Sequence, residues 1–544
     1  MEKHAGVDIP SRSKVLVIGG GPAGSYSASA LAREGIDVVL LEADTFPRYH
    51  IGESMLPAMR FLLKFIDADR KFVNHGFTKK TGAAFKLTVN KREGYTDFLD
   101  VGGPENYVWN VVRSEADEIL FRHAAESGAK VFDGVKVTSI LFGEVNDQKA
   151  SRPVKAIYTR KSDAISGEIE FDYLVDASGR SGILSTRYLK NRIHNCSLNN
   201  IASWAYWSNT KKYAAGTSRE NSPFFEALTD ESGWAWFIPL HIGTSVGIVM
   251  DKTVLASKKA QNSTLSGQDL YLQQLELAPS VLSLIGDGSL IIPSDGASAI
   301  RSGIDASYSA RSYGAENFRI CGDAGAFIDP FFSTGVHLAL IGGLSAALTI
   351  CASLRGDCSE KDAAKWHSDR IASTYTWFLM VVLGAYKQMR RQSEPVLSDI
   401  DKDNFDLAFS DIRPVIQGSM DIEGSYTHAE LLKTLDLCSK ILGFSQPEDR
   451  ESVLRKLQTL PPETRSPASS EDADTDRRGQ RDEVQMEKVI SSESEKSAFD
   501  YIETRKIIRP AAKLYSIESF ATTVINGMVP RLEHGQLGLK DYGH

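Results

Sequence analysis

Six residues near the amino terminus have the types and spacing that hold a diphosphate. Gly19, Gly21 and Gly24 match the pattern GxGxxG within the run Gly-Gly-Gly-Pro-Ala-Gly. Glycines permit a tight turn and a close approach of the backbone to a pyrophosphate, and the helix that follows points its positive end at that group. Glu42 follows Gly24 by eighteen residues, where a carboxylate accepts a hydrogen bond from a ribose 2′-hydroxyl. This acid favours FAD or NAD over a dinucleotide with a phosphorylated ribose.

The elements around this glycine run predict the beginning of a parallel α/β sheet. Residues 14–18 form a short apolar strand, residues 25–34 an alanine-rich helix and residues 37–41 a second apolar strand. A strand before the glycines and a helix after them is the context that a dinucleotide-binding turn requires. The alternative is a glycine turn in another α/β protein that binds no nucleotide.

Three later features favour FAD over NAD. The strand of residues 171–175 leads into Asp-x-x-Gly at residues 176–179, and the strand of residues 317–321 leads into Gly-Asp-Ala, with Asp323 at its centre. Together with Arg113, which precedes both, these segments resemble the aromatic-hydroxylase class of flavoproteins. The resemblance implies that the Gly-Asp segment contacts the ribityl and phosphate part of FAD and that Arg113 contacts the cofactor. Taken singly, each motif is common in turns and on surfaces.

A tryptophan-rich segment separates the hydroxylases from a related family. Residues 233–239, Gly-Trp-Ala-Trp-Phe-Ile-Pro, match the signature GWxWxIP of the flavin-dependent halogenases. With three further stretches, this segment makes the chain similar to the fungal halogenases that act on phenolic polyketides. The resemblance implies that the aromatic side chains close off the flavin region and disfavour monooxygenation. By geometry alone, Trp234 and Trp236 would simply be neighbours on one face of a core strand.

Lys86 ends the second stretch, Gly-Ala-Ala-Phe-Lys at residues 82–86. The halogenase family places its catalytic lysine at the end of such a segment. The resemblance therefore implies that Lys86 holds hypohalous acid, or forms a haloamine, beside an aromatic carbon. We expect a buried amine that faces an enclosed passage leading from the flavin. A strand lysine that points to solvent is the alternative.

The third and fourth stretches resemble the parts of the family that surround the flavin and the halide. Residues 48–54 end in Gly-Glu-Ser and resemble the strap segment, so Glu53 is expected to contact the cofactor. Residues 329–336 precede a long apolar helix, whose first amides lack partners and whose dipole is positive at that end. The resemblance implies a halide bound by Thr334 and Gly335. A plain helix cap without an ion is the alternative.

Phe332 departs from the pattern of the tryptophan-directed halogenases, which have glutamate immediately before Ser-Thr-Gly. A mechanism that needs a carboxylate at this position is therefore not expected. A phenol is activated toward electrophiles by its own oxygen, so it depends less on such a group. The departure favours a phenolic substrate over an indole.

The resemblance implies a complete reaction. Reduced FAD from a separate flavin reductase forms a C4a-hydroperoxide with O2, which oxidises chloride or bromide to hypohalous acid. Lys86 then delivers the halogen to a phenol, free or tethered to a carrier protein. The residues assigned to FAD are Gly19, Gly20, Gly21, Ala23, Gly24, Glu42, Glu53, Arg113, Asp323 and Val336.

Two rival interpretations remain open. An FAD-dependent aromatic hydroxylase on the same fold would place a hydroxyl group on the ring and would need neither Lys86 nor the tryptophan signature. A non-catalytic FAD-binding protein would keep the glycine run and Asp323 but would have no use for Lys86.

The composition excludes several classes of partner. The chain has 544 residues and a net charge of −8, so it has no electrostatic reason to bind nucleic acid or an anionic membrane. Its five cysteines lack metal-ligand spacing, which predicts free thiols in a reducing compartment and no metal site. The apolar stretches 336–354 and 377–385 are expected to be buried helices rather than membrane spans. We expect a cytoplasmic protein.

The predicted fold is α/β. It combines a doubly wound parallel sheet that binds FAD, as in the aromatic hydroxylases, with an antiparallel substrate sheet and a helical C-terminal region that covers the substrate. The expected segments are an FAD-binding core at 14–360, interleaved with the substrate-side sheet at about 80–110 and 195–300; a helical region at 361–460; a disordered linker rich in Ser, Glu, Asp, Arg and Pro at 461–496; and a helix and tail at 497–544.

Overall fold

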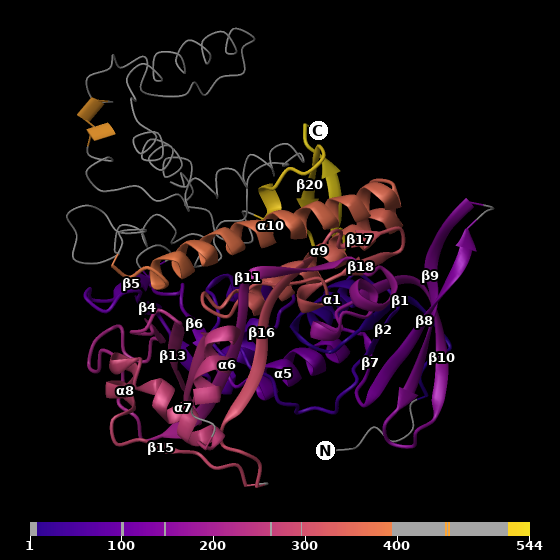
Figure 1. The fold of residues 1–544 in the computed structure, drawn as a ribbon. Coiled ribbons are helices and arrows are strands. Elements are labelled where there is room, and N and C mark those ends of the chain that lie inside the picture. The colour runs from indigo at the N-terminus through magenta and orange to yellow at the C-terminus, as the bar shows by residue number, and fades with distance from the viewer. Residues whose placement is uncertain are drawn as a thin grey trace.

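The protein is built on two large sheets formed by interleaved parts of one chain (Figure 1). The computed structural model describes residues 8–99, 103–145, 148–261, 264–294, 296–393, 452–453, 455–456 and 520–543. The predicted linker at 461–496, the predicted helix that follows it and nearly all of the predicted helical region beyond residue 393 lie outside the described residues.

A parallel sheet carries the glycine turn. Its strands follow the order β18, β10, β1, β2, β7, and each neighbouring pair is parallel. β2, β18 and the carboxyl-terminal halves of β1 and β10 are buried, as is typical of strands covered on both faces. The strands are β1 (Arg12–Ile18), β2 (Val38–Leu41), β7 (Lys130–Phe132), β10 (Ser166–Asp176) and β18 (Phe318–Ile320).

Helices cover one face of this sheet and a β-ribbon covers the other. The helical face packs against α1 (Pro22–Arg33), α5 (Arg113–Glu126) and α9 (Thr334–Arg355). The opposite face packs against β8 (Val135–Val145) and β9 (Gln148–Arg160), which continue antiparallel from β10. β7 and β8 are separate strands because Gly134, between them, turns the chain at a φ of +69°.

A second, mostly antiparallel sheet lies beside the first. Its order is β19, β16, β11, β14, β13, β12, β4, β5, and only the pair β12 and β4 is parallel. The strands are β4 (Gly82–Lys86), β5 (Gly94–Asp97), β11 (Arg192–Ser208), β12 (Phe224–Ala227), β13 (Gly233–Leu240), β14 (Gly243–Asp251), β16 (Arg301–Ala310) and β19 (Ala326–Phe327), and β15 (Ser289–Leu290) pairs with β11.

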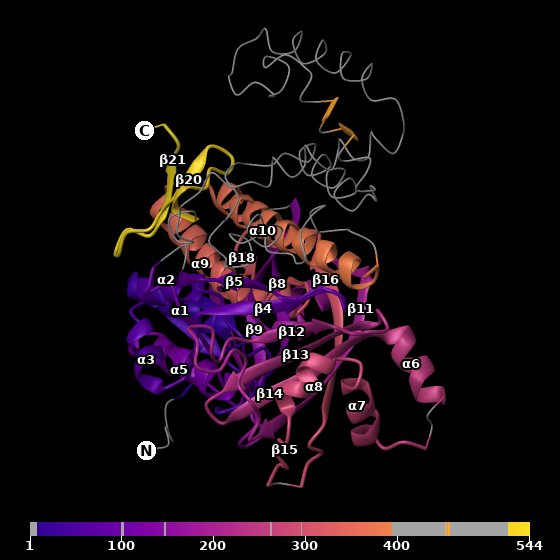
Figure 2. The same ribbon diagram turned by 90° about the vertical axis from the view of Figure 1, so that its left-hand side faces the viewer.

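Alternate residues of β13 enter two different cores. Trp234 and Trp236 belong to the core that packs under α10 (Glu360–Met389). This core lies on the same side of the sheet as the cavity of the candidate site. Ala235 and Phe237 belong to the opposite core, which packs under α6 to α8. These helices lie on the outer side of the second sheet (Figure 2). This period-two alternation decides which residues of the second sheet can reach the nucleotide-binding unit. The outer helices are α6 (Lys252–Gln261), α7 (Gly267–Leu275) and α8 (Pro279–Ile285).

Short elements complete the described chain. A two-stranded sheet near the strap consists of β3 and β6, and a carboxyl-terminal hairpin of β20 and β21 is joined to the end of α9 by an ion pair between Arg531 and Asp357 (2.8 Å). These elements are α2 (Ala58–Phe65), α3 (Asp69–His75), β3 (Thr78–Lys80), β6 (Val108–Asn110), η1 (Gly179–Ser181), η2 (Ile183–Tyr188), β17 (Gly314–Ala315), η3 (Gly322–Ala324), β20 (Met528–Arg531) and β21 (Gly538–Asp541).

Within the described residues, α9 is the one helix long and apolar enough to cross a membrane. It has 22 residues, but 89% of its apolar window is buried inside the fold. It packs closely on α1, where a β-carbon on Gly343 would stand 2.6 Å from the carbonyl oxygen of Ala23. The helix is therefore a core element whose small residues allow two helices to approach.

We predict that Gly343→Ala destabilises the protein. The added methyl group overpacks the contact between α1 and α9, which costs about 1–3 kcal/mol in well-packed cores. The matched control is Gly267→Ala at the start of α7, where a β-carbon meets nothing within 4 Å. Thermal unfolding should show a lower apparent melting temperature for Gly343→Ala and an unchanged or higher one for the control. Equal melting temperatures would contradict this packing argument.

Candidate active site

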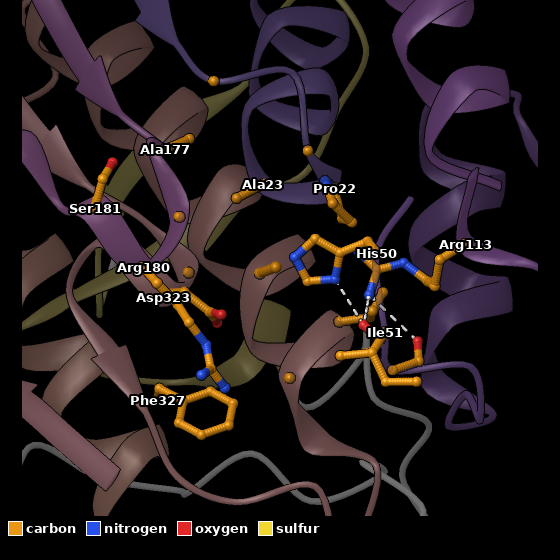
Figure 3. Close-up of a pocket in the computed structure, with 18 of the residues that line it drawn as sticks. Pro22, Ala23, His50, Ile51, Arg113, Ala177, Arg180, Ser181, Asp323 and Phe327 are labelled. Atoms are coloured by element: carbon orange, nitrogen blue, oxygen red, sulfur yellow. Dashed lines mark hydrogen bonds between the residues drawn. The ribbon is translucent and has the colours of Figure 1, made fainter. Parts of the chain in front are cut away.

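A cavity of about 700 Å³ lies between the carboxyl ends of β1 and β2 and the second sheet. Its walls come from the glycine turn at 19–24, the strap segment at 48–54 and residues 321–336. Asp323 and Arg180 lie across the cavity from His50 and Arg113 (Figure 3). Pockets of roughly 300–1,000 Å³ enclose cofactor-sized ligands, so this cavity is large enough for most of a dinucleotide.

The glycine turn has the geometry of a diphosphate cradle. A β-carbon on Gly24 would lie 1.9 Å from the carbonyl oxygen of Gly19, and one on Gly19 would lie 2.2 Å from that of Ala177, so both positions require glycine. Gly21 differs, because its β-carbon would meet nothing closer than Arg48 Nη2 at 3.4 Å and would point into open space. Gly21 and Ala23 line the cavity at the start of α1. This arrangement fits a pyrophosphate at the helix amino terminus.

Glu42 lies at the end of β2, on the cavity wall. Its Oε2 accepts a hydrogen bond from the amide of Gly20 (2.6 Å), and its Oε1 accepts one from the amide of Asp44 (2.8 Å). These two bonds fix the carboxylate beside the glycine turn, where a ribose of a bound dinucleotide would lie.

Arg113 joins helix α5 to the strap segment. Its guanidinium binds both carboxylate oxygens of Asp117 (2.8 and 2.9 Å) and donates from Nη1 to the carbonyl of Ile51 (2.9 Å). Arg113 and burial together lower the pKa of the neighbouring His50 to about 4, so this imidazole is neutral at physiological pH. Arg48, which also lines the cavity, donates from Nη1 to the same Asp117 carboxylate (3.0 Å), so two fixed guanidinium groups lie on this side.

Glu53 ends a line of hydroxyl groups that runs inward from the surface. Tyr206 donates to Glu53 Oε1 (2.6 Å), and Tyr49 Oη lies 3.1 Å from Tyr206 Oη. Trp204 Nε1 donates to Tyr49 (2.6 Å). Tyr49 is 44% exposed, whereas Glu53 is buried and lines the cavity. Burial raises the pKa of Glu53 to about 7, so this carboxyl group titrates near neutrality.

Asp323 follows β18 in η3 and lines the cavity. Its carboxylate is partly withdrawn from water, which raises its pKa, while Arg180, Arg113 and Arg192 oppose this effect. Arg180 itself lies over the ring of Phe327, 4.3 Å from the centroid. The Gly-Asp segment is thus placed on the wall that a ribityl chain would follow.

Two tryptophans form a fixed aromatic wall. Trp234 Nε1 donates to Tyr386 Oη (2.7 Å), and Trp236 Nε1 donates to Ser245 Oγ (3.1 Å). Trp234 also packs edge-on against Phe331, with 5.0 Å between ring centroids. Both indoles line the cavity, and their N–H groups are satisfied by buried partners, which holds the rings in one orientation.

The start of α9 presents its amide groups near this wall. Ser333 precedes the helix at a φ of +59°, and its side chain does not cap the helix. Gly335 and Val336 line the cavity, and a β-carbon on Gly335 would meet nothing within 4 Å. Thr334 is buried and does not line the cavity with its side chain. The first amides of α9 lack intrahelical acceptors and fit a small anion.

Lys86 ends β4 and its amine lies on the side of that strand toward α8. It does not line the cavity, and its amine donates to Ser280 Oγ (3.0 Å) and pairs with Glu226 Oε1 (3.4 Å), toward α8. Its neighbour Phe85 faces the aromatic core beside the cavity, at 5.2 Å from Phe332 between ring centroids. The amine therefore points away from the cavity, since consecutive strand residues point to opposite faces. The expectation of an enclosed passage from the flavin to this amine stays a prediction.

Lys80 is a buried lysine that sequence analysis missed. Its amine donates to Ser54 Oγ and to the carbonyl of Met55, both at 2.8 Å, and burial lowers its pKa to about 7. Ser54 belongs to the strap segment and lines the cavity. Lys80 follows Thr78 and Lys79 in a short polar strand, so nothing in the local sequence indicates its burial.

The sequence profile of the family described as tryptophan halogenase matches residues 14–105 and 96–425. The chain belongs to the flavin-dependent halogenases and is an enzyme of that class. This membership implies FAD as the cofactor, and the glycine cradle, Glu42 and the cavity fit that molecule. The predicted family and the predicted fold class are confirmed.

The similarity to named halogenases covers nearly the whole chain. The flavin-dependent halogenase ascD of Acremonium egyptiacum is 52% identical over 542 residues, covering 98% of this chain and 93% of that protein. The sulochrin halogenase gedL of Aspergillus terreus is 44% identical over 551 residues, covering 98% and 94%. Among solved structures, the myxobacterial chondrochloren halogenase CndH, an FAD-dependent halogenase, has a TM-score of 0.62 at 28% identity, covering 70% of this chain and 83% of that chain.

We predict that Gly21→Val weakens FAD binding without unfolding the protein. Gly21 has an extended backbone with a φ of −72°, so valine is tolerated there, but its methyl groups would occupy the space of the pyrophosphate. Fluorescence titration with FAD should show binding weakened at least about tenfold, or ~1.4 kcal/mol, with Gly21→Ala intermediate. An unchanged melting temperature of the FAD-free variant is the control. Normal FAD affinity in Gly21→Val would place the pyrophosphate elsewhere.

We predict that Glu53→Gln flattens the pH dependence of stability. The folded-state pKa of about 7 lies above the value of about 4.3 in an unfolded chain. Glu53 therefore contributes stability that is complete below the unfolded value and is lost as pH rises through about 7. Glutamine stays neutral and still accepts from Tyr206. Between about pH 5 and pH 8, the melting temperature of the FAD-free variant should fall less than that of the FAD-free wild type.

The control for this prediction is Glu118→Gln, which removes a partly exposed carboxylate of the same helix that carries Arg113. Its melting temperature should follow that of the wild type across the same range. A Glu53→Gln profile parallel to the wild type would mean that Glu53 is ionised throughout.

Proposed function

We propose that the protein transfers chlorine or bromine to a carbon of an electron-rich phenol. The observation that supports this best is the aromatic wall of Trp234 and Trp236, held by hydrogen bonds at the cavity. A hydroxylase must bring the ring of its substrate to the flavin itself. A fixed wall of indoles instead keeps the substrate ring away from the flavin edge. Only a small diffusible oxidant would then pass from the flavin to the substrate.

The residues around the cavity would hold FAD along its length. The amides of the turn at 19–24 and the first turn of α1 bind the pyrophosphate, and Glu42 binds the ribose. Arg113 holds the strap through the carbonyl of Ile51, so that Glu53 of the strap faces the flavin, and Asp323 faces the ribityl chain. Bound in reduced form, FAD supplies the activation of O2 that oxidises the halide. A separate flavin reductase would provide reduced FAD, as the resemblance implies.

The halide would bind at the start of α9. The amides of Thr334 and Gly335 lie at the positive end of a 22-residue helix and have no intrahelical acceptor. The open space at the α-carbon of Gly335 leaves room for an anion between the helix and the cavity. Chloride or bromide held there would be positioned beside the cofactor.

The substrate would be a phenol because the enzyme offers no carboxylate before Ser333. Phe332 occupies that position, is 2% exposed and packs against Phe85 and Phe331. A ring activated by its own hydroxyl group needs no such carboxylate. A relative at 44% identity is named for sulochrin, which supports a secondary-metabolite substrate, either free or tethered to a carrier.

Lys86 would deliver the halogen, as its position in the family motif implies. Its amine lies with Ser280 and Glu226 on the α8 side of β4, so the phenol would bind on that side and the oxidant would cross the sheet beside β4. Glu226 also accepts from the amide of Val281 (2.9 Å), which fixes its carboxylate near the amine. Glu226 is therefore placed to accept the proton that the ring loses.

The activity is tested by supplying chemically reduced FAD, O2 and either chloride or bromide, with resorcinol as a simple phenol. Mass spectrometry should show products whose mass changes with the halide supplied. A product heavier by one oxygen atom, independent of halide, would replace this proposal with hydroxylation.

A cytoplasmic location and the absence of nucleic-acid and membrane partners stay predictions.

We predict that Lys86→Ala lowers resorcinol bromination at least about a hundredfold, the lower end of the loss on removing a proton-handling side chain. FAD binding and the oxidation of reduced FAD should persist, because Lys86 does not line the cavity. Lys86→Arg keeps the positive charge but lacks the primary amine. Bromination by this variant would support hydrogen bonding to hypohalous acid, and its loss would support haloamine formation. Lys130→Ala, at a half-exposed lysine that pairs with Asp37, is the control.

Full bromination by Lys86→Ala would remove Lys86 from the mechanism. If Lys80→Met then lost bromination while still oxidising reduced FAD, the amine beside the strap would take its place.

A further inference from the structure

Three side chains from distant parts of the sequence converge outside the FAD cavity. His75 ends α3, Glu115 lies in the first turn of α5, and His241 lies in the turn between β13 and β14. His75 Nε2 lies 2.7 Å from Glu115 Oε2, and His241 Nε2 lies 3.2 Å from the same oxygen. All three ligand atoms are within 4.8 Å of one another.

We propose that this cluster binds one divalent transition-metal ion, with Zn²⁺ as the expected occupant. Zinc bonds to imidazole nitrogen and carboxylate oxygen are about 2.0–2.2 Å long, so tetrahedral ligand atoms stand about 3.3 Å apart. The separations of 2.7 and 3.2 Å are close to this value, and small side-chain rotations would open the shorter one. Two imidazoles and one carboxylate are a donor set that zinc accepts and that calcium and magnesium, which prefer oxygen, do not.

The two imidazole rings are oriented by an aromatic neighbour. Phe77 is buried, and its ring centroid lies 4.3 Å from that of His75 and 5.8 Å from that of His241. The two histidine rings meet edge to face at 6.1 Å between centroids. Because the rings are held by packing, the site loses little side-chain entropy when an ion binds.

The partial exposure of the cluster leaves a place for a water ligand. The side chains of His75, Glu115 and His241 are 33%, 34% and 29% exposed. Three protein ligands and one water complete a tetrahedral zinc site. Ion entry from solvent therefore needs no opening of the fold.

The ion would join the two units of the fold. His75 and Glu115 belong to helices of the nucleotide-binding unit, whereas His241 follows β13, the strand that carries Trp234 and Trp236. Glu115 is two residues from Arg113, which holds the strap. The role of the ion is structural, since none of its three ligands lines the cavity. The sequence predicts no metal site because that prediction considers cysteine spacing alone.

The test uses the full chain without a histidine tag, stripped with EDTA and dialysed. Titration with zinc against a chromogenic chelator should give one equivalent bound at neutral pH, and elemental analysis should confirm it. Binding should weaken at acidic pH, because protons compete for the imidazoles. Cobalt(II) should give a visible absorption band of a low-coordinate site. Zinc should raise the apparent melting temperature, and EDTA should reverse the rise.

Variants separate the cluster from adventitious histidine sites. His75→Ala and His241→Ala should each weaken zinc binding at least tenfold, and Glu115→Gln should do the same while keeping a side chain of similar shape. His194→Ala, a histidine of β11 outside the cluster, should bind zinc as the wild type does. Failure of the wild type to bind zinc, or unchanged binding by the Glu115→Gln and His241→Ala variants, would overturn the proposal. These readouts do not involve halogenation, so they are independent of the proposed function.

Discussion

The arrangement of the cavity depends on one buried carboxylate, that of Asp329. Its Oδ2 accepts from Tyr386 Oη (2.7 Å), which in turn accepts from Trp234 Nε1 (2.7 Å) and Asn200 Nδ2 (2.9 Å). Its Oδ1 accepts from the amide of Phe331 (2.9 Å). A buried carboxylate without partners costs several kcal/mol. The network therefore has to form as a whole, and it ties the tryptophan wall, α10 and the approach to α9 into one rigid unit.

The nucleotide side of the protein could be predicted because its signals are local. Gly19 and Gly24 are required by contacts within the turn itself and with the end of β10, and the glycine pattern reports those contacts directly. The flanking strands are apolar where both faces are buried, at Val15–Ile18 of β1 and throughout β2, so their position in the sequence is plain. For the same reason Glu42 is found where the spacing from Gly24 places it, at the end of β2.

The positions of side chains on the second sheet depend on contacts between distant segments, which a single sequence does not predict. Its alternation predicts that Trp234 and Trp236 share a face, and they do, but alternation alone does not tell which face meets the cavity. For Lys86 this choice depends on pairing with Glu226 of β12, a strand far along the chain. Tyr206 beside Glu53, and His241 beside Glu115, are likewise joined by tertiary contacts between distant segments. The burial of Lys80 is not predicted for a different reason. Buried lysines are rare, so a lysine in a polar strand is expected to be exposed.

The fold protects the thiol beside the cavity from the hypohalous acid of the proposed reaction. Cys321 lines the cavity, and its thiol donates to the carbonyl of Gly342 (3.2 Å). Burial raises its pKa far above neutrality, and burial also raises the pKa values of Cys351 and Cys358. Because oxidation of cysteine proceeds through the thiolate, thiols kept protonated react slowly with hypohalous acid. The apolar packing of α9 against β18 that buries Cys321 thus serves stability and chemical resistance through the same contacts.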